Sequence, residues 1–197
     1  MSTPDEIAQP QRDTRRRILQ AALAGLRDSQ GADLTMAEVA ARAGVSRQAV
    51  YLHFADRAAL VLALVSHLDE TKGAAAAIAD APSARAAVAA MVAAQAGDGP
   101  ALWPVVRIFD GLRPGDPAVE AAWQDRLSER LAHCRAIAER FKAEGALAPH
   151  LSLEAAADLL CTLTSLPIWQ ELVLDRGWSA ERYRSHVAYL AAGAVTK

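Results

Sequence analysis

The chain has 197 residues, a formal net charge of −2 at pH 7 and 52% hydrophobic residues. This length suffices for one or two domains with a sizeable core, while the near-neutral charge gives no information about a polyanionic partner. The two cysteines lack CxxC spacing and the N-terminus lacks a signal-peptide pattern, so we expect a reduced, cytoplasmic setting. The most apolar stretches, 86–97 and 159–170, are shorter than the roughly 20 residues that span a bilayer, so we predict no membrane segment.

The composition predicts an all-α fold. Alanine, the best helix former, occurs 46 times, and no stretch shows the sustained alternation of β-branched and polar residues that marks a half-buried strand. Residues 1–12, which include Pro4 and Pro10, are expected to form a loose N-terminal arm. Residues 13–29 then carry apolar side chains at helical spacing, so the first helix is predicted there.

The stretch from Thr35 to Gly44 predicts a short helix over residues 36–42 with both ends specified. Thr35 and Glu38 have the spacing of a capping box, and Gly44 stands where a left-handed residue commonly ends a helix. Ser46 is a suitable N-cap for the next helix. Two short helices joined by a tight turn that contains glycine form a helix-turn-helix.

The second of these helices begins with side chains suited to reading DNA. Arg47, Gln48 and Tyr51 fall within an arc of about 100°, while Val50 lies on the reverse side, where it can pack. A recognition helix presents its N-terminal residues to base edges in the major groove. Arginine can bridge O6 and N7 of guanine, and glutamine can pair with N6 and N7 of adenine.

Residues 35–60, TMAEVAARAGVSRQAVYLHFADRAAL, resemble the DNA-binding signature of the tetracycline-repressor (TetR) family. The shared features are the threonine at the start of the second helix, the Ala-Gly-Val turn, the serine cap, the Tyr-x-His-Phe sequence and the acidic–basic pair that opens the fourth helix. With the arginine-rich first helix, the resemblance covers about residues 13–64. It implies a three-helix DNA-binding bundle over residues 13–56, followed by a larger helical effector-binding and dimerisation domain over residues 57–197.

The resemblance also implies roles for individual residues. Base contacts are implied for Arg47, Gln48 and Ala49, the last through a thymine methyl group. Phosphate contacts are implied for Thr35, Ser46, Tyr51, His53 and Arg57. Arg57 stands where many members have lysine, which preserves the charge, and exposed N–H groups at the start of its helix would reinforce an anion site.

Alternatives remain open for these residues. The polar face could simply be solvated in a small three-helix bundle, and His53 beside Phe54 could be a packed, hydrogen-bonded side chain. Arg15, Arg16 and Arg17 could contact phosphates or be plain solvated charges.

Beyond the helix-turn-helix, the sequence predicts helices at 57–79, 83–96, 102–111, 117–145, 153–174 and 180–194. The GDGP stretch at 97–100 is expected to separate two of them. Asp116 followed by Pro117 is a strong signal for a helix start. Pro167 is expected to kink the helix in which it lies.

By the family resemblance, the middle helices would line an effector cavity and the last two would form a four-helix interface with a second copy. The candidate cavity residues are Trp103, Arg107, Phe109, Trp123 and Trp169; alternatively, the aromatic side chains fill the core and Arg107 is exposed. The candidate interface residues are Leu160, Tyr183, Val187, Leu190 and Ala191. The default ligand for such a cavity is largely apolar with a few polar groups.

The predicted function is that of a ligand-responsive repressor, which binds a palindromic site on double-stranded DNA as a homodimer and is released by a small, largely apolar effector. The alternatives are a helix-turn-helix activator, a regulator without a small ligand, and a partner-binding dimer without DNA affinity. We find no GxSxG, P-loop, HExxH or dinucleotide motif. We therefore predict no catalytic residues, metal ligands or cofactors, and we do not expect an enzyme.

Overall fold

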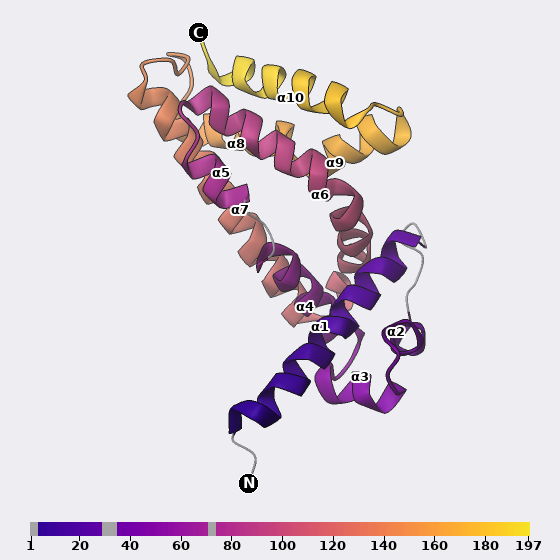
Figure 1. Ribbon diagram of the computed structural model, residues 1–197. Coiled ribbons are helices and arrows are strands. Elements are labelled where there is room, and N and C mark those ends of the chain that lie inside the picture. Colours follow the sequence, from indigo (N-terminus) through magenta and orange to yellow (C-terminus); the bar gives the residue numbers. More distant parts are fainter. Residues whose placement is uncertain (1–3, 29–34, 71–73) are drawn as a thin grey trace. The chain divides into compact units, whose positions relative to one another are not determined.

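The computed structural model describes residues 4–28, 35–70 and 74–197, which fold into helices joined by short connections (Figure 1). The chain forms two compact units, the first from residues 1–71 with 101–122 and the second from residues 72–100 with 123–197. The expected all-α fold is confirmed for the described residues. The helices are α1 (Pro4–Asp28), α2 (Met36–Ala43), α3 (Arg47–His53), α4 (Arg57–Glu70), α5 (Ala74–Ala79), α6 (Ala84–Leu112), the 3₁₀ turn η1 (Arg113–Gly115), α7 (Pro117–Ala143), α8 (Leu153–Leu163), α9 (Leu166–Trp169), the π-helical η2 (Gln170–Asp175) and α10 (Ala180–Val195).

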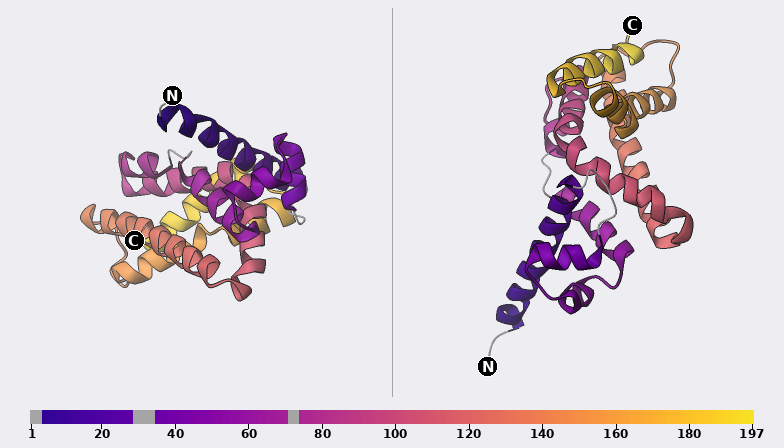
Figure 2. Two further views of the ribbon diagram at one scale, coloured as in Figure 1. Left: turned by 90° about the horizontal axis from the view of Figure 1, so that it is seen from below. Right: turned by 90° about the vertical axis from the view of Figure 1, so that its right-hand side faces the viewer.

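The first unit has its core between α1 and the short helices that follow. α1 packs against α2 and α4, and α2 packs against α3 (Figures 1 and 2). Ile18, Val39 and Val50 have no exposed surface, and α4 buries Leu60 and Leu64. The domain boundary expected after residue 56 therefore falls within a compact unit, because α4 shares its core with the helix-turn-helix.

The first helix begins earlier than the sequence predicted. α1 starts at Pro4, so residues 4–12 are helical where a loose arm was expected, and residues 1–3 lie outside the described part. Proline fits the first position of a helix, because the N–H that it lacks would have no intrahelical partner there. Pro4 therefore stands at the start of a helix, where the sequence predicted a loose arm.

The helix predicted over residues 57–79 is divided. α4 ends at Glu70 and belongs to the first unit, α5 belongs to the second, and residues 71–73 lie outside the described part. Arg140 of α7 holds the C-terminal end of α5 by donating hydrogen bonds to the carbonyl groups of Ile78, at 3.0 Å, and Ala81. Among the described residues, no single helix is long and apolar enough to cross a membrane; α3 and α4 meet that test only as a pair bent by 67°.

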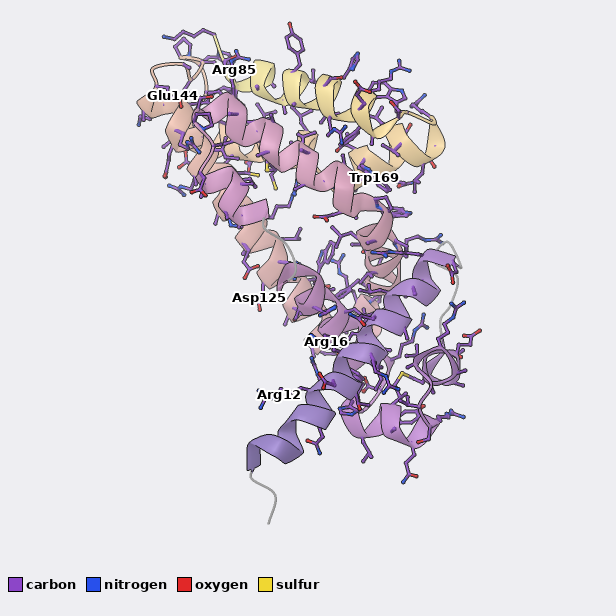
Figure 3. The ribbon with its side chains drawn as sticks, in the orientation of Figure 1. Arg12, Arg16, Arg85, Asp125, Glu144 and Trp169 are labelled. Atoms are coloured by element: carbon purple, nitrogen blue, oxygen red, sulfur yellow. The ribbon has the colours of Figure 1, made fainter. Side chains whose placement is uncertain are left out.

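The GDGP stretch does not separate two helices. α6 runs without interruption from Ala84 to Leu112. An ideal Cβ at Gly99 would lie 2.2 Å from Cε2 of Trp169, which is buried on α9 (Figure 3). Gly99 therefore allows close packing against an indole ring, where the sequence predicted a turn.

The signals at both ends of α7 are confirmed. The Asp116 carboxylate accepts hydrogen bonds from the backbone N–H groups of Ala118, at 2.9 Å, and Val119, at 3.4 Å. Gly145 ends this segment with a φ of 68°, in the left-handed region. The adjacent Glu144 accepts a hydrogen bond of 2.8 Å from the N–H of Ala84 and so caps the start of α6 (Figure 3).

The helix predicted over residues 153–174 is broken near Pro167, as expected. α8 ends at Leu163, and Pro167 occupies the beginning of α9. α10 packs against α8 within the second unit. Of the five predicted interface residues, only Leu190 is exposed, at 57%; Leu160, Tyr183, Val187 and Ala191 are buried within the single chain. Those four pack inside one chain, which corrects the prediction that they meet a second copy.

Candidate nucleic-acid interface and ligand site

The α2–turn–α3 segment has the local geometry that its sequence predicts. The Thr35 backbone N–H and hydroxyl each donate to a Glu38 carboxylate oxygen at 2.8 Å, and the Glu38 N–H donates back to the Thr35 hydroxyl oxygen at 3.2 Å. Gly44 has a φ of 62°. Ser46 caps α3 by accepting from the N–H of Ala49 at 3.1 Å. These contacts define where α2 begins and ends and where α3 begins.

α3 buries one side and exposes the other. Val50 is fully buried, whereas Arg47 and Gln48 are exposed and Tyr51 is 41% exposed. The guanidinium carbon of Arg47 lies 5.7 Å from the centroid of the Tyr51 ring. This cation–π contact limits the positions open to a long side chain, so Arg47 is partly preorganised at the start of α3.

One exposed residue of α3 was missed by the sequence analysis. Leu52 is 80% exposed, although it is a large apolar side chain. It follows Gln48 by four residues and therefore lies on the same face of the helix. That spacing could have identified it as a second apolar group, after Ala49, for contact with a thymine methyl; Ala49 itself is half-buried.

The predicted phosphate contacts fall into two groups. Ser46 and Tyr51 are exposed, and Arg57 is half-buried at the first position of α4, where the Asp56 carboxylate accepts from the N–H of Ala59 at 2.8 Å. His53 is half-buried, and its ring centroid lies 6.3 Å from that of Phe54 at an angle of 47°. The His53 ring therefore lies beside Phe54 and also keeps exposed surface, so it has features of both alternatives, a packed side chain and a phosphate contact.

Thr35 differs from the prediction. Both of its donors, the hydroxyl and the backbone N–H, are directed to Glu38, so neither is directed toward a phosphate. The hydrogen bonds from the Thr35 N–H and hydroxyl also hold the pKa of the Glu38 carboxyl below its ordinary value. This geometry favours a capping role for Thr35 over a phosphate contact.

The three consecutive arginines of α1 have different environments. Arg17 donates to the carbonyl oxygens of Ala43, at 2.9 Å, and Gly44, at 3.5 Å, at the C-terminal end of α2. The guanidinium carbon of Arg15 lies 5.3 Å from the centre of the Phe54 ring. Arg16, labelled in Figure 3, is 3.5 Å from Asp13. Arg17 therefore holds α2 against α1 as well as carrying charge.

The candidate cavity residues divide between the two units. Trp103, Arg107 and Phe109 lie in the first unit, and Trp123 and Trp169 lie in the second. Phe109 and Trp169 are buried, Trp103 and Trp123 are half-buried, and Arg107 is exposed. The alternative prediction, in which aromatic side chains fill the core and Arg107 is exposed, is therefore met at Phe109, Trp169 and Arg107.

Two capped helices joined at Gly44, with Arg47 and Gln48 exposed at the start of the second helix, define a helix-turn-helix, the motif of many DNA-binding proteins. Residues 18–64 match the family model described as bacterial regulatory proteins, tetR family, so the chain carries a TetR-type DNA-binding segment, and solved TetR-family regulators share the fold of the chain. The chain is therefore a DNA-binding transcriptional regulator. The resemblance inferred from residues 35–60 is confirmed.

Individual relatives extend this comparison. Over 65 residues the chain is 38% identical to the nucleoid occlusion factor SlmA of Idiomarina loihiensis, and the match spans only 33% of each protein. A TetR transcription regulator from Haloarcula marismortui is 20% identical, with a TM-score of 0.73 over 94% of this chain and 99% of its own. FadR from Bacillus subtilis, solved in complex with stearoyl-CoA, is 16% identical, with a TM-score of 0.72 over 91% and 98% of the two chains. At these identities, the structural matches show a shared fold.

Proposed function

We propose that this protein represses transcription by binding a near-palindromic DNA site as a homodimer, and that a small, largely apolar effector releases it. The observation that carries the proposal is the exposed start of α3, where Arg47 and Gln48 project from a helix that Val50 anchors in the core. Arginine and glutamine each form bidentate hydrogen bonds with one purine in the major groove. Ser46, Tyr51 and Arg57 would hold the flanking phosphates.

Homodimerisation would place two copies of α3 on one site. A two-fold dimer presents identical reading helices, which explains why such proteins bind palindromic half-sites about one helical turn apart. In the second unit, α8 and α10 leave the large apolar side chains of Leu159, Tyr189 and Leu190 exposed by 37%, 79% and 57%. We assign the interface to this outer side of α8 and α10, since their inner residues pack within the chain.

The effector proposal rests on the half-buried indoles. Within the first unit, Trp103 retains exposed surface and can meet a ligand, with Arg107 as a cation for a polar group; Trp123 is the half-buried candidate in the second unit. FadR is solved with stearoyl-CoA, which has a long acyl chain, and this supports a largely apolar ligand. Release requires reciprocity: a ligand that weakens DNA binding must itself bind more weakly to the DNA complex.

Selection from a pool of random duplexes by the purified full chain tests the proposal. We expect enrichment of a sequence with two-fold symmetry, bound by two chains per duplex. The stoichiometry is measured by sedimentation of the complex with a labelled duplex. A pool that shows no enrichment would contradict DNA reading by α3. An asymmetric site bound by one chain would contradict dimeric recognition but would leave DNA reading by α3 in place.

A further inference from the structure

The two cysteines of the chain lie together, although 26 residues separate them in the sequence. Cys134 is in α7 and Cys161 in α8, both in the second unit, and Arg130, one turn before Cys134, donates a hydrogen bond of 3.2 Å to the Cys161 carbonyl; the two thiols are close enough to shift each other's pKa. Both are free thiols. Cys134 has no exposed surface, whereas Cys161 is partly exposed. A small solute can therefore reach Cys161, whereas Cys134 is shielded from solvent.

An arginine is fixed beside this pair. Arg130 precedes Cys134 by one turn of α7, so both project from the same face of that helix. Its guanidinium donates to the carbonyl of Cys161 at 3.2 Å, to the hydroxyl of Thr164 at 2.8 Å and to the carbonyl of Thr164. Because the Cys161 carbonyl and two oxygen atoms of Thr164, the residue that ends α8, hold it, the cation stays next to Cys161.

The surroundings of the two sulfur atoms shift their pKa values in opposite directions. The hydrogen bond from the Cys134 thiol, reinforced by Arg130, lowers the pKa of Cys161, although burial and the Asp158 carboxylate oppose this effect. The same hydrogen bond, together with burial, raises the pKa of Cys134. The partly exposed sulfur is thus the better thiolate, and the buried one remains a thiol.

We propose that Cys161 and Cys134 form a peroxide-reactive dithiol, in which Cys161 is oxidised first by a hydroperoxide and Cys134 then closes a disulfide between α7 and α8. A reactive, accessible thiolate next to a second cysteine is the arrangement that favours reversible oxidation over irreversible damage. The proposal concerns the second unit alone and does not depend on the proposed DNA function.

The two steps balance with the hydroperoxide as the only oxidant. The Cys161 thiolate attacks one peroxide oxygen, the S–O bond forms as the O–O bond breaks, and the departing alkoxide or hydroxide takes a proton from water. The Cys134 sulfur then attacks the sulfenic acid, the S–S bond forms as the S–O bond breaks, and the thiol proton leaves with hydroxide as water. The peroxide gains two electrons, one from each sulfur.

The proposed dimer would leave this pair accessible. Residues two positions apart on an α-helix point about 200° apart. Cys161 therefore lies nearly opposite Leu159, which is among the residues assigned to the interface. Oxidation at Cys161 is thus compatible with the dimer.

Stoichiometric hydrogen peroxide added to the reduced full-length chain tests the proposal. We expect the wild type to lose both thiols and two hydrogens of mass, and peptide mapping to join the segments that contain Cys134 and Cys161. Cys134→Ser should instead stop at a sulfenic acid that a dimedone reagent traps. Cys161→Ser should retain its remaining thiol under the same dose.

Two results would overturn the proposal. One is a Cys161→Ser chain that loses its Cys134 thiol as fast as the wild type does. The other is a wild-type chain whose thiols survive the treatment or join only between chains. Because Cys134 is fully buried, far-UV circular dichroism should first confirm that its variant folds; the wild-type mass and peptide map decide the question independently of any variant.

Discussion

Tyr51 offers DNA two different groups, a ring that lies beside the Arg47 guanidinium and a hydroxyl that can donate to a phosphate. Tyr51→Phe removes only the hydroxyl and should weaken binding to every duplex by about 1 kcal/mol, because a phosphate contact carries no sequence information. Arg57→Ala should also weaken all complexes and lower the slope of log affinity against log salt by about one. Titration against the selected site and a scrambled duplex at several salt concentrations measures both effects. A loss confined to the selected site would exclude the phosphate role.

Glu38 gives the helix-turn-helix a dependence on pH. Its carboxyl has a lowered pKa in the folded chain, so its contribution to stability is present above the ordinary value of 4.5 and is lost as the pH falls through the folded value. Glu38→Gln should therefore be less stable than the wild type at pH 7, and the difference should shrink in acid. Urea unfolding at pH 7 and pH 3 measures it, with the exposed Glu129→Gln on α7 as the control. A difference that stays constant with pH would contradict the capping role.

The residues of α3 and its caps could be predicted because their signals are local. Thr35, Glu38, Gly44 and Ser46 act on backbone groups within four residues, so spacing alone determines what they contact. The environments of Arg15 and Arg17 could not be predicted in this way. Their partners, Phe54 and Ala43, lie far along the chain and come within reach only after α1 packs against α2.

At the scale of single helices, Gly99 and Gly97 form a matched pair within α6. Gly99→Ala places a Cβ in the space of the Trp169 ring and should cost about 1–3 kcal/mol of the free energy of unfolding. Gly97→Ala meets no atom within 4 Å and should stabilise the helix by up to about 1 kcal/mol. Urea unfolding followed by circular dichroism compares them. Equal stabilities for the two variants would contradict the packing role of Gly99.

The helix boundaries that the sequence missed share one cause. Glycine and proline both occur in turns, but glycine also removes a side chain at a close approach, and proline also starts helices. At Gly99 the missing side chain permits a close approach, and at Pro4 the proline starts a helix. A single sequence does not distinguish these uses from a turn. Likewise, an apolar stripe on α10 has the same spacing whether it faces α8 or a second chain, so burial of Tyr183 and Val187 required the structure.

At the scale of the whole molecule, dimerisation can be separated from folding within α10. Leu190→Glu places a charge on an exposed position and should give folded monomers with reduced affinity for the selected DNA. Val187→Glu buries an unpaired charge and should destabilise the chain itself, typically by several kcal/mol. Sedimentation velocity and thermal unfolding together distinguish the two outcomes. A Leu190→Glu chain that remains dimeric would show that the interface does not lie on the outer side of α8 and α10.

Reading of base edges by α3 is tested most directly with every single-base-pair variant of the selected site and with wild-type and Arg47→Ala proteins. The wild type should lose about 1–3 kcal/mol at each base pair that it reads. Arg47→Ala should bind the intact site more weakly by a similar amount, and it should no longer distinguish bases at one position in each half-site. The exposed Arg184→Ala on α10 is the charge-matched control and should keep every preference. An Arg47→Ala protein with unchanged affinity and the wild-type preference at every position would contradict base reading by α3.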